Sequence, residues 1–145
     1  MTTATARAGL VPPTGETAEA AEIVERFLEA SMVPDPVKAA TFVSSELRIT
    51  FTGGRKYSHP RETAAFNARR YKWVKKRFER TDVVPSVGET IVYNLGTLHG
   101  EWPDGTAFES NRYVDRFVVR GGQIVQMDVW NDSAERLLTR HGIDG

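Results

Sequence analysis

Cysteine is absent from this chain of 145 residues, which excludes disulfides, zinc–thiolate sites and thiol nucleophiles. Basic and acidic side chains balance at 19 each, so no net charge draws the chain to nucleic acid or to an anionic membrane. No apolar run approaches the length that spans a membrane. The sequence also has no metal-binding cluster of adequate spacing and no phosphate-binding glycine loop. We therefore expect no metal, no cofactor, no nucleic acid and no membrane among its partners.

The first 15 residues are small, polar and proline-containing, and they lack the apolar core of a signal peptide. We expect a flexible tail over residues 1–15 and a cytoplasmic location. The remaining residues, 16–145, contain no repeat and no linker. At 40% apolar content they suit one domain with one core.

Helical patterns dominate the first half of the chain. Apolar residues at helical spacing predict a helix over residues 16–32, which Pro34 and Pro36 end, and a short second helix follows. The β-formers of Leu47–Thr52 predict a strand, and Gly53-Gly54 then turns the chain into a short return strand at Lys56-Tyr57. A basic helix is predicted to begin at Pro60 and to run to about Arg80.

The second half reads as a sheet. It contains three long strands and a weaker one, joined by turn signals at Pro103-Asp104-Gly105 and Gly121-Gly122; the strands are Ile91–Trp102, Ala107–Val119 and Gln123–Trp130, with the weaker one near Asp82–Pro85. Helices followed by an antiparallel meander predict an α+β fold, with the helices on one side of the sheet.

This order of elements, with RITFTGG after two helices and DRFVVRGGQIVQMDVWND near the end, resembles the NTF2-like superfamily and its SnoaL-like branch. The resemblance covers about residues 16–135. It implies a cone, in which a curved mixed or antiparallel sheet wraps around a long helix and encloses an apolar pocket. It also implies a homodimer through the convex sheet face, where we place Val114, Val118, Ile124 and Trp130.

Strand alternation, aligned on the family hairpin, predicts which side chains face the pocket. The concave face receives Tyr113, Asp115, Met127, Val129 and Asn131, with Thr97 and His99 from the neighbouring strand. The full set of predicted substrate-binding residues is Lys56, Phe27, Phe51, Phe66, Arg69, Arg70, Trp73, Thr97, Phe117, Met127, Val129 and Asn131.

Asp115 is the first candidate for acid–base catalysis, because a carboxyl group in apolar surroundings has a raised pKa. The alternative is a structural salt bridge to Arg112 or Arg116. His99 and His59 are candidate general bases. The alternative for His99 is a rim residue that is hydrogen-bonded to a neighbour.

Two tyrosines, Tyr57 and Tyr113, are candidate donors to a developing oxyanion, or else aromatic lining. Arg69 or Arg70 could turn inward and clamp an anion, although most of the basic run reads as a solvated face. Lys56 could reach the pocket mouth.

The best-known acids of the family are missing here. A Tyr-Asp pair of dehydratases corresponds to about Ser31-Met32, and the isomerase aspartate falls within Ile49–Phe51, where there is no carboxylate. The epoxide hydrolase Arg/Asp pair falls near Leu95 and Thr97.

We therefore expect a cofactor-independent lyase or isomerase that acts on a small aromatic substrate. The phrases FTGGRKY, FNARRYKWVKKR and GTLHGEWPDG are similar to diarylpropane γ-formaldehyde lyases, which convert a lignin-derived diol into a stilbene and formaldehyde. The alternatives are a non-catalytic binding module and a polyketide cyclase or dehydratase of the SnoaL-like type.

Overall fold

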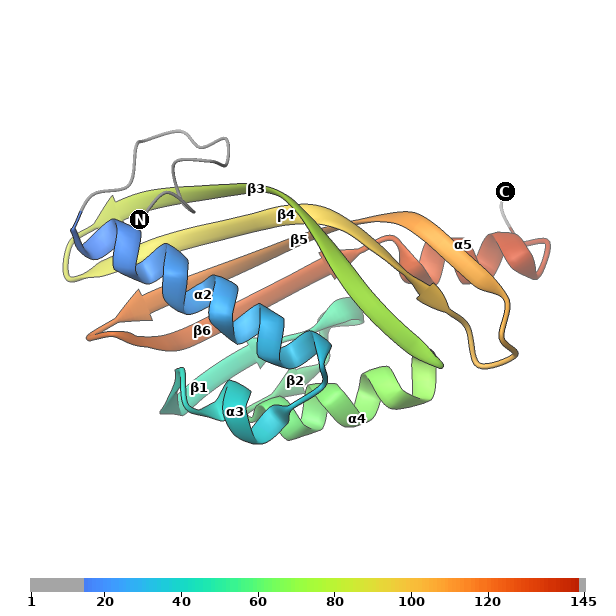
Figure 1. Ribbon diagram of the computed structural model, residues 1–145, viewed down its shortest axis with the longest axis horizontal. Helices are drawn as coiled ribbons and strands as arrows, with labels where there is room; N and C mark the ends of the chain where they lie inside the picture. Colours follow the sequence, from blue (N-terminus) through green and yellow to red (C-terminus); the bar gives the residue numbers. More distant parts are fainter. Residues whose placement is uncertain (1–14, 144–145) are drawn as a thin grey trace.

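One six-stranded sheet forms the body of the protein, in a computed structural model that describes residues 15–143 (Figure 1). The strand order is β2-β1-β6-β5-β4-β3. Neighbours pair antiparallel except β1 and β6, which are parallel, so the sheet is mixed. The strands are β1 (Val43–Thr50), β2 (Lys56–Tyr57), β3 (Trp73–Ser86), β4 (Glu89–Glu101), β5 (Ala107–Arg120) and β6 (Gln123–Asn131). The predicted α+β fold is confirmed; the predicted tail falls almost wholly outside the described residues.

Within residues 15–143, four α-helices accompany the sheet: α2 (Glu16–Met32), α3 (Pro36–Ala40), α4 (Pro60–Arg70) and α5 (Ser133–Arg140). Helix α2 lies across one face of the sheet, α3 and α4 lie below it near β1 and β2, and α5 extends from the far end (Figure 1). The α2 stripe Val24, Phe27 and Leu28 is buried against the sheet and forms the core with it. Among residues 15–143, no helix has the length and apolar content needed to cross a membrane.

The predicted helix from Pro60 to Arg80 is wrong beyond Arg70. From Trp73 onward the chain pairs with β4 along its whole length, and the weak strand near Asp82–Pro85 is the end of this long β3. Trp73, Val74 and Phe78 fit a helical stripe as well as an alternating strand, and pairing with β4 decides between them. The helix that the sheet curves over is therefore α2.

The register between β4 and β5 defines the two faces of the sheet. Asn94 lies opposite Asp115, and Leu98 lies opposite Asn111 on the same inner face. Thr97 and His99 therefore lie on the outer face, and their predicted place beside Asp115 is wrong. A shift of one residue in the assumed register moves every side chain of a strand to the other face.

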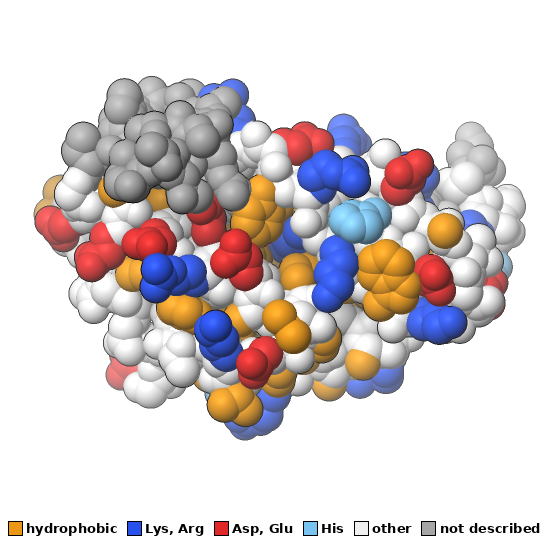
Figure 2. Space-filling view, viewed as in Figure 1, with side chains coloured by type: hydrophobic (Ala, Val, Ile, Leu, Met, Phe, Trp, Pro, Cys, Tyr) orange, Lys and Arg blue, Asp and Glu red, His pale blue; other side chains and the backbone are white. Residues whose placement is uncertain are grey.

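The outer face differs from the prediction at one further point. A register shift after Val118 turns Ile124 into the core, where it is fully buried, so Ile124 is not on the convex face as predicted. Trp130 is 57% exposed on that face. The side of the molecule shown in Figure 2 carries basic, acidic and hydrophobic side chains intermixed. The homodimer stays a prediction.

Close approach of β3 to β4 depends on Gly96. A β-carbon there would lie 2.0 Å from the Arg77 carbonyl oxygen and 3.1 Å from the Tyr113 ring. We expect Gly96→Ala to lower the free energy of unfolding by about 3 kcal/mol, because the backbones of β3 and β4 must move apart to admit the methyl group. Urea unfolding measures the change in this free energy. Gly54→Ala is the matched control, because its β-carbon meets nothing within 4 Å and only its φ of 81° is unfavourable. It should lose about 1 kcal/mol; equal losses would contradict the expectation.

Candidate functional site

An internal pocket lies between the C-terminal half of α2, helix α4 and the inner face of the sheet. Its volume is about 40 Å³. That space is large enough for a water molecule, but its volume is far below the roughly 300–1,000 Å³ of small-molecule sites. The lining is mainly apolar with several polar side chains; it comprises Phe27, Leu28, Ser31, Met32, Phe51, Thr63, Asn67, Tyr71, Val74, Lys76, Leu98, Tyr113, Met127, Val129 and Asn131.

Lys76 is the single charged side chain among the described residues that line this pocket. It points inward from β3, and its ammonium pairs with the Asp115 carboxylate on β5. The Lys76 side chain is 8% exposed and that of Asp115 is 0% exposed. The ammonium also lies 4.2 Å from the centre of the Tyr113 ring, a favourable cation–π distance. A cation thus faces the pocket with its counterion buried behind it.

The electrostatics of Asp115 follow from its complete burial. Loss of hydration raises the pKa of this carboxyl above its ordinary value, and the Lys76 charge and hydrogen bond oppose that rise. Its Oδ1 has no hydrogen-bond partner among residues 15–143. Only one carboxylate oxygen is therefore satisfied among these residues, and the Lys76 charge is what favours the ionised form of the group. The predicted arginine partners are elsewhere: Arg112 pairs with Asp132, and Arg116 with Asp128.

Lys76 was not among the predicted site residues, because the basic segment that contains it was predicted to be an exposed helix. The signal that could have found it is the alternation of Val74, Lys76 and Phe78, which share one face of a strand. A lysine between two apolar residues at this spacing is predicted to point into the core.

A chain of buried hydrogen bonds runs from the pocket to α2. The Tyr113 hydroxyl donates to Asn94 Oδ1 at 2.6 Å, and Asn94 Nδ2 donates to Thr81 Oγ1 at 3.1 Å. The Thr81 hydroxyl in turn donates to Glu25 Oε2 at 3.0 Å. All four residues are buried. The chain ties the pocket wall to a carboxylate on α2.

The hydrogen bonds of this chain all run toward α2. The Thr81 hydroxyl donates to the Glu25 carboxyl group and accepts from the Asn94 amide. The Asn94 carbonyl is left to accept from Tyr113. The single Tyr113 proton is thereby committed to Asn94. The Tyr113 hydroxyl thus donates within the protein, whereas the sequence-based hypothesis made it a donor to a substrate.

We expect Thr81→Val to lower the free energy of unfolding by about 1–3 kcal/mol, because both the Asn94 amide and Glu25 lose a buried partner. Thermal or urea unfolding measures the change. Thr97→Val is the matched control on the outer face of the adjacent strand, and it should stay within about 0.5 kcal/mol of the parent. Equal losses of unfolding free energy in Thr97→Val and Thr81→Val would show that the buried chain of hydrogen bonds adds no stability.

Helix α5 is joined to the far wall of the pocket by a second buried cluster. The Tyr71 hydroxyl donates to Ser133 Oγ at 2.6 Å, and the Ser133 backbone N–H donates to Asn131 Oδ1 at 3.0 Å. Burial raises the pKa of the Tyr71 hydroxyl, and its bond to Ser133 opposes the rise. Tyr71 and Asn131 both line the pocket, so the Tyr71 hydroxyl and the Asn131 side-chain oxygen are already engaged there.

The structure gathers part of the predicted site and separates the rest. Tyr113, Met127, Val129, Asn131, Phe27 and Phe51 line the internal pocket. Phe117 is fully buried beneath it, with its ring centre 5.9 Å from that of Phe27. Asp115 reaches the pocket only through Lys76. These residues come from α2, from Phe51 just after β1, and from β5 and β6, elements whose order along the chain was predicted.

The candidates near the predicted mouth have structural partners and do not line the pocket. Lys56 donates to Thr50 Oγ1 at 2.8 Å, and the Tyr57 ring packs edge-on against Phe51. His59 caps α4, with Nδ1 accepting from the Arg61 backbone N–H at 3.0 Å. A nitrogen held in a helix cap is not available as a general base in this conformation.

The remaining candidates lie on the outside of the α4–β3 connection or on the outer face. Arg69 is exposed. The Arg70 guanidinium lies 4.8 Å from the centre of the Phe66 ring, away from the pocket lining. Trp73 and His99 contact each other on the outer face, with ring centres 5.9 Å apart. No group of three or more potential metal-ligating His, Asp or Glu side chains occurs within residues 15–143.

No family model matches the sequence, and no curated protein matches it. Solved structures show the fold. A protein from Jannaschia sp. CCS1, described as a SnoaL-like polyketide cyclase, has a TM-score of 0.67 at 16% identity over 86% of this chain and 94% of its own. An NTF2-like protein of unknown function from Burkholderia pseudomallei has a TM-score of 0.66 at 17% identity over 82% of this chain and 95% of its own. A protein from Shewanella frigidimarina, described as a ketosteroid isomerase, has a TM-score of 0.62 at 13% identity, over 77% and 94%.

Proposed function

We propose that this protein, which has the cone fold of NTF2-like proteins, is a cofactor-independent lyase or isomerase that acts on a small aromatic substrate in the internal pocket. The observation that supports this is the buried Lys76–Asp115 pair at the pocket wall. A buried ion pair is a poor way to gain stability, so its presence beside a cavity favours a chemical role. The solved neighbours described as a cyclase and as an isomerase are consistent with this class.

Each inward polar group has a distinct role in this proposal. Lys76 touches the substrate and stabilises or protonates an oxygen on which negative charge develops. Asp115 is a positioning residue, which holds the ammonium charged and in place. The Tyr113 ring, which lines the pocket and lies 4.2 Å from the Lys76 ammonium, packs against the aromatic substrate.

The sharper form of the proposal is removal of formaldehyde from a diarylpropane diol. The substrate phenol loses its proton, and its electrons expel the benzylic hydroxyl, which takes a proton from Lys76 and leaves as water. The resulting quinone methide accepts the electron pair of the C–C bond that breaks as the terminal alcohol loses its proton. The products are a stilbene, formaldehyde and water. Of the two protons that leave the substrate, one replaces the proton that Lys76 gave up and the other returns to the phenolate oxygen of the stilbene, so the atoms balance without a cofactor.

Substrate entry requires the pocket to widen, since its volume of about 40 Å³ is too small for one aromatic ring. Met32 and Met127 both line it. Methionine has three rotatable bonds and repacks readily, so rotation of these two side chains is the simplest way to admit a ligand.

A non-catalytic binding module is the second candidate, and one observation favours it. Asp115 is engaged in an internal salt bridge, which is what a purely structural carboxylate would show. Such a module would hold an aromatic ligand against Lys76 without changing it.

Incubation with a panel of diaryl diols, with formaldehyde and stilbene measured separately, tests the proposed function. We expect the two products in equal amounts from at least one diol. A substrate-independent check is binding of 4,4′-dihydroxystilbene, a product-like probe. Tight binding without turnover of any diol would favour the binding module, and neither binding nor turnover would contradict both readings.

A further inference from the structure

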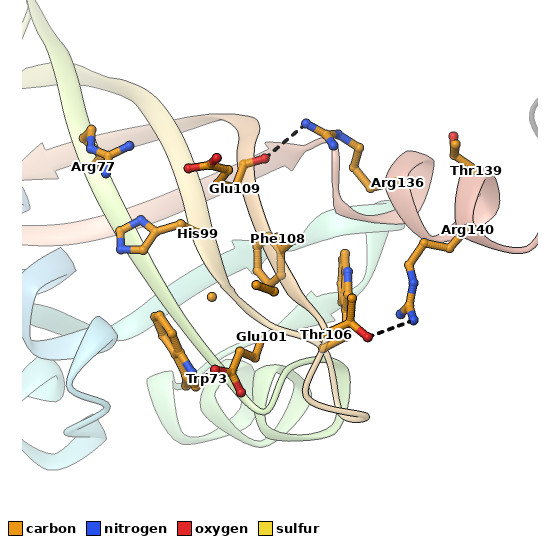
Figure 3. Close-up of a pocket in the computed structure, with 13 residues that line it drawn as sticks. Trp73, Arg77, His99, Glu101, Thr106, Phe108, Glu109, Arg136, Thr139 and Arg140 are labelled. Carbon is orange, nitrogen blue, oxygen red and sulfur yellow. Dashed lines mark hydrogen bonds between the residues drawn. The ribbon is translucent and has the colours of Figure 1, made fainter.

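We propose a second ligand site, for a small planar aromatic carboxylate, in a groove between α5 and the ends of β3, β4 and β5 (Figure 3). The groove has a volume of about 710 Å³, against about 40 Å³ for the internal pocket. It shares no lining residue with that pocket. Its size falls in the range of small-molecule sites, and it needs no side chain to move.

Aromatic side chains provide the apolar surface of the groove. Trp73 is 41% exposed, and its ring meets that of His99 nearly edge to face, at 83°. Phe108 lines the floor and is stacked on Trp102 at 4.4 Å, which holds it rigidly. Nδ1 of His99 is buried without a hydrogen-bond partner in the described part of the chain, so polar pairing beside the groove is incomplete. These surfaces suit a flat ring.

The charges of the groove favour an anion. Three arginines and two glutamates line it, and Lys72 and Asp104 pair with Glu101 and Arg140 respectively, so the groove together with these two partners carries one excess positive charge. Arg140 is matched by Asp104 at 2.7 Å. The Arg136 guanidinium donates to the Glu109 backbone oxygen on β5 at 3.1 Å, Arg77 is exposed on β3, and neither guanidinium forms an ion pair within residues 15–143. Two guanidinium groups are therefore open to a carboxylate, which they can bind with paired hydrogen bonds.

The arrangement in Figure 3 places these groups around one space. Trp73, His99 and Arg77 lie on one side, Arg136 and Arg140 lie on the α5 side, and Phe108 lies between them. A ring over Phe108 with its face or edge against Trp73 would direct a carboxylate toward an arginine on either side. The site is open to solvent, so we expect a dissociation constant on the order of 0.1–1 mM for a ligand of about a dozen heavy atoms.

The test uses 2-naphthoate as the probe and 2-naphthamide as its uncharged match, titrated into the full ¹⁵N-labelled chain. The indole N–H signals of Trp73, Trp102 and Trp130 report on different surfaces. We expect saturable shifts at Trp73 and little change at Trp130, with naphthoate bound several-fold more tightly than naphthamide.

Variants separate the contribution of charge from that of the ring. Arg77→Gln should weaken naphthoate binding about threefold to fivefold and leave naphthamide unchanged. Trp73→Leu should weaken both probes about tenfold, as followed by the backbone ¹⁵N–H signals of the groove, since the Trp73 indole signal is lost. Arg48→Gln, an exposed arginine on β1, is the control and should change neither affinity. The ¹⁵N spectrum confirms that each variant remains folded.

Three results would overturn the inference. The first is no shift at Trp73 up to the solubility limit of naphthoate. The second is equal affinity for naphthoate and naphthamide. The third is a dimer in sedimentation in which a second copy of the chain covers the groove, so that naphthoate neither binds in the groove nor dissociates the dimer. The outcome does not depend on whether the internal pocket is catalytic.

Discussion

Lys76→Met should lower the free energy of unfolding by about 3–5 kcal/mol at pH 7, because it leaves the fully buried Asp115 carboxylate without its cation. Asp115→Leu should have an effect of similar size, since it leaves the Lys76 ammonium unpaired. The double variant Lys76→Met/Asp115→Leu should be close to the parent or more stable, because it removes both charges together. Urea unfolding of the four proteins completes the cycle. Additive losses would show that the two groups are not coupled.

The pH dependence of Lys76→Met has a definite sign. Burial raises the pKa of Asp115 in the folded state, and the variant removes the charge that opposes this rise. A raised folded-state pKa gives stability that is complete below the unfolded value, which is about 3.9, and that is lost as the pH rises through the folded value. Stability of the variant should therefore increase as the pH falls from 7 toward 4. The double variant should lack this dependence.

The second large effect concerns catalysis. If the proposed function holds, Lys76→Met/Asp115→Leu should lower kcat/KM by about 10²–10⁴-fold, because it removes the only charged group among the described residues that line the pocket. Most of the loss should be in kcat, since the charge acts on an oxygen that becomes negative in the transition state. Initial rates of stilbene formation measure it.

The double variant suits this experiment because it is expected to fold. Lys38→Met, an exposed lysine on α3, is the matched control and should retain full activity. A double variant that is folded and fully active would show that the Lys76–Asp115 pair has a structural role and takes no part in catalysis.

Much of the fold was predictable because its local signals and its pairing agree. The α2 stripe, the Gly53-Gly54 turn and the hairpin around Gly121-Gly122 carry their structure in nearby residues, and they lie where predicted. The β3 segment does not. The spacing of its apolar residues fits both the helical and the strand period. Only its pairing with β4, which the local sequence does not encode, decides that it is a strand.

The site was less predictable for the same reason. Tyr113 and Asp115 were placed together because they alternate within one strand, which needs no register. His99 was misplaced because its face depends on the pairing of two strands, and one residue of error reverses it. Lys76 was missed because its strand was assigned as a helix. Its partnership with Asp115 spans 39 residues of sequence, and no local pattern encodes it.

The central claim is that an aromatic ligand binds in the internal pocket against Lys76, and ¹⁵Nζ signals of labelled lysines test it most directly. Titration with 4,4′-dihydroxystilbene should shift one lysine signal that exchanges slowly with water, as expected for a side chain 8% exposed. That signal should be absent from the spectrum of Lys76→Met/Asp115→Leu. A bound stilbene that leaves the Lys76 signal unmoved, or that binds the double variant equally well, would contradict the account.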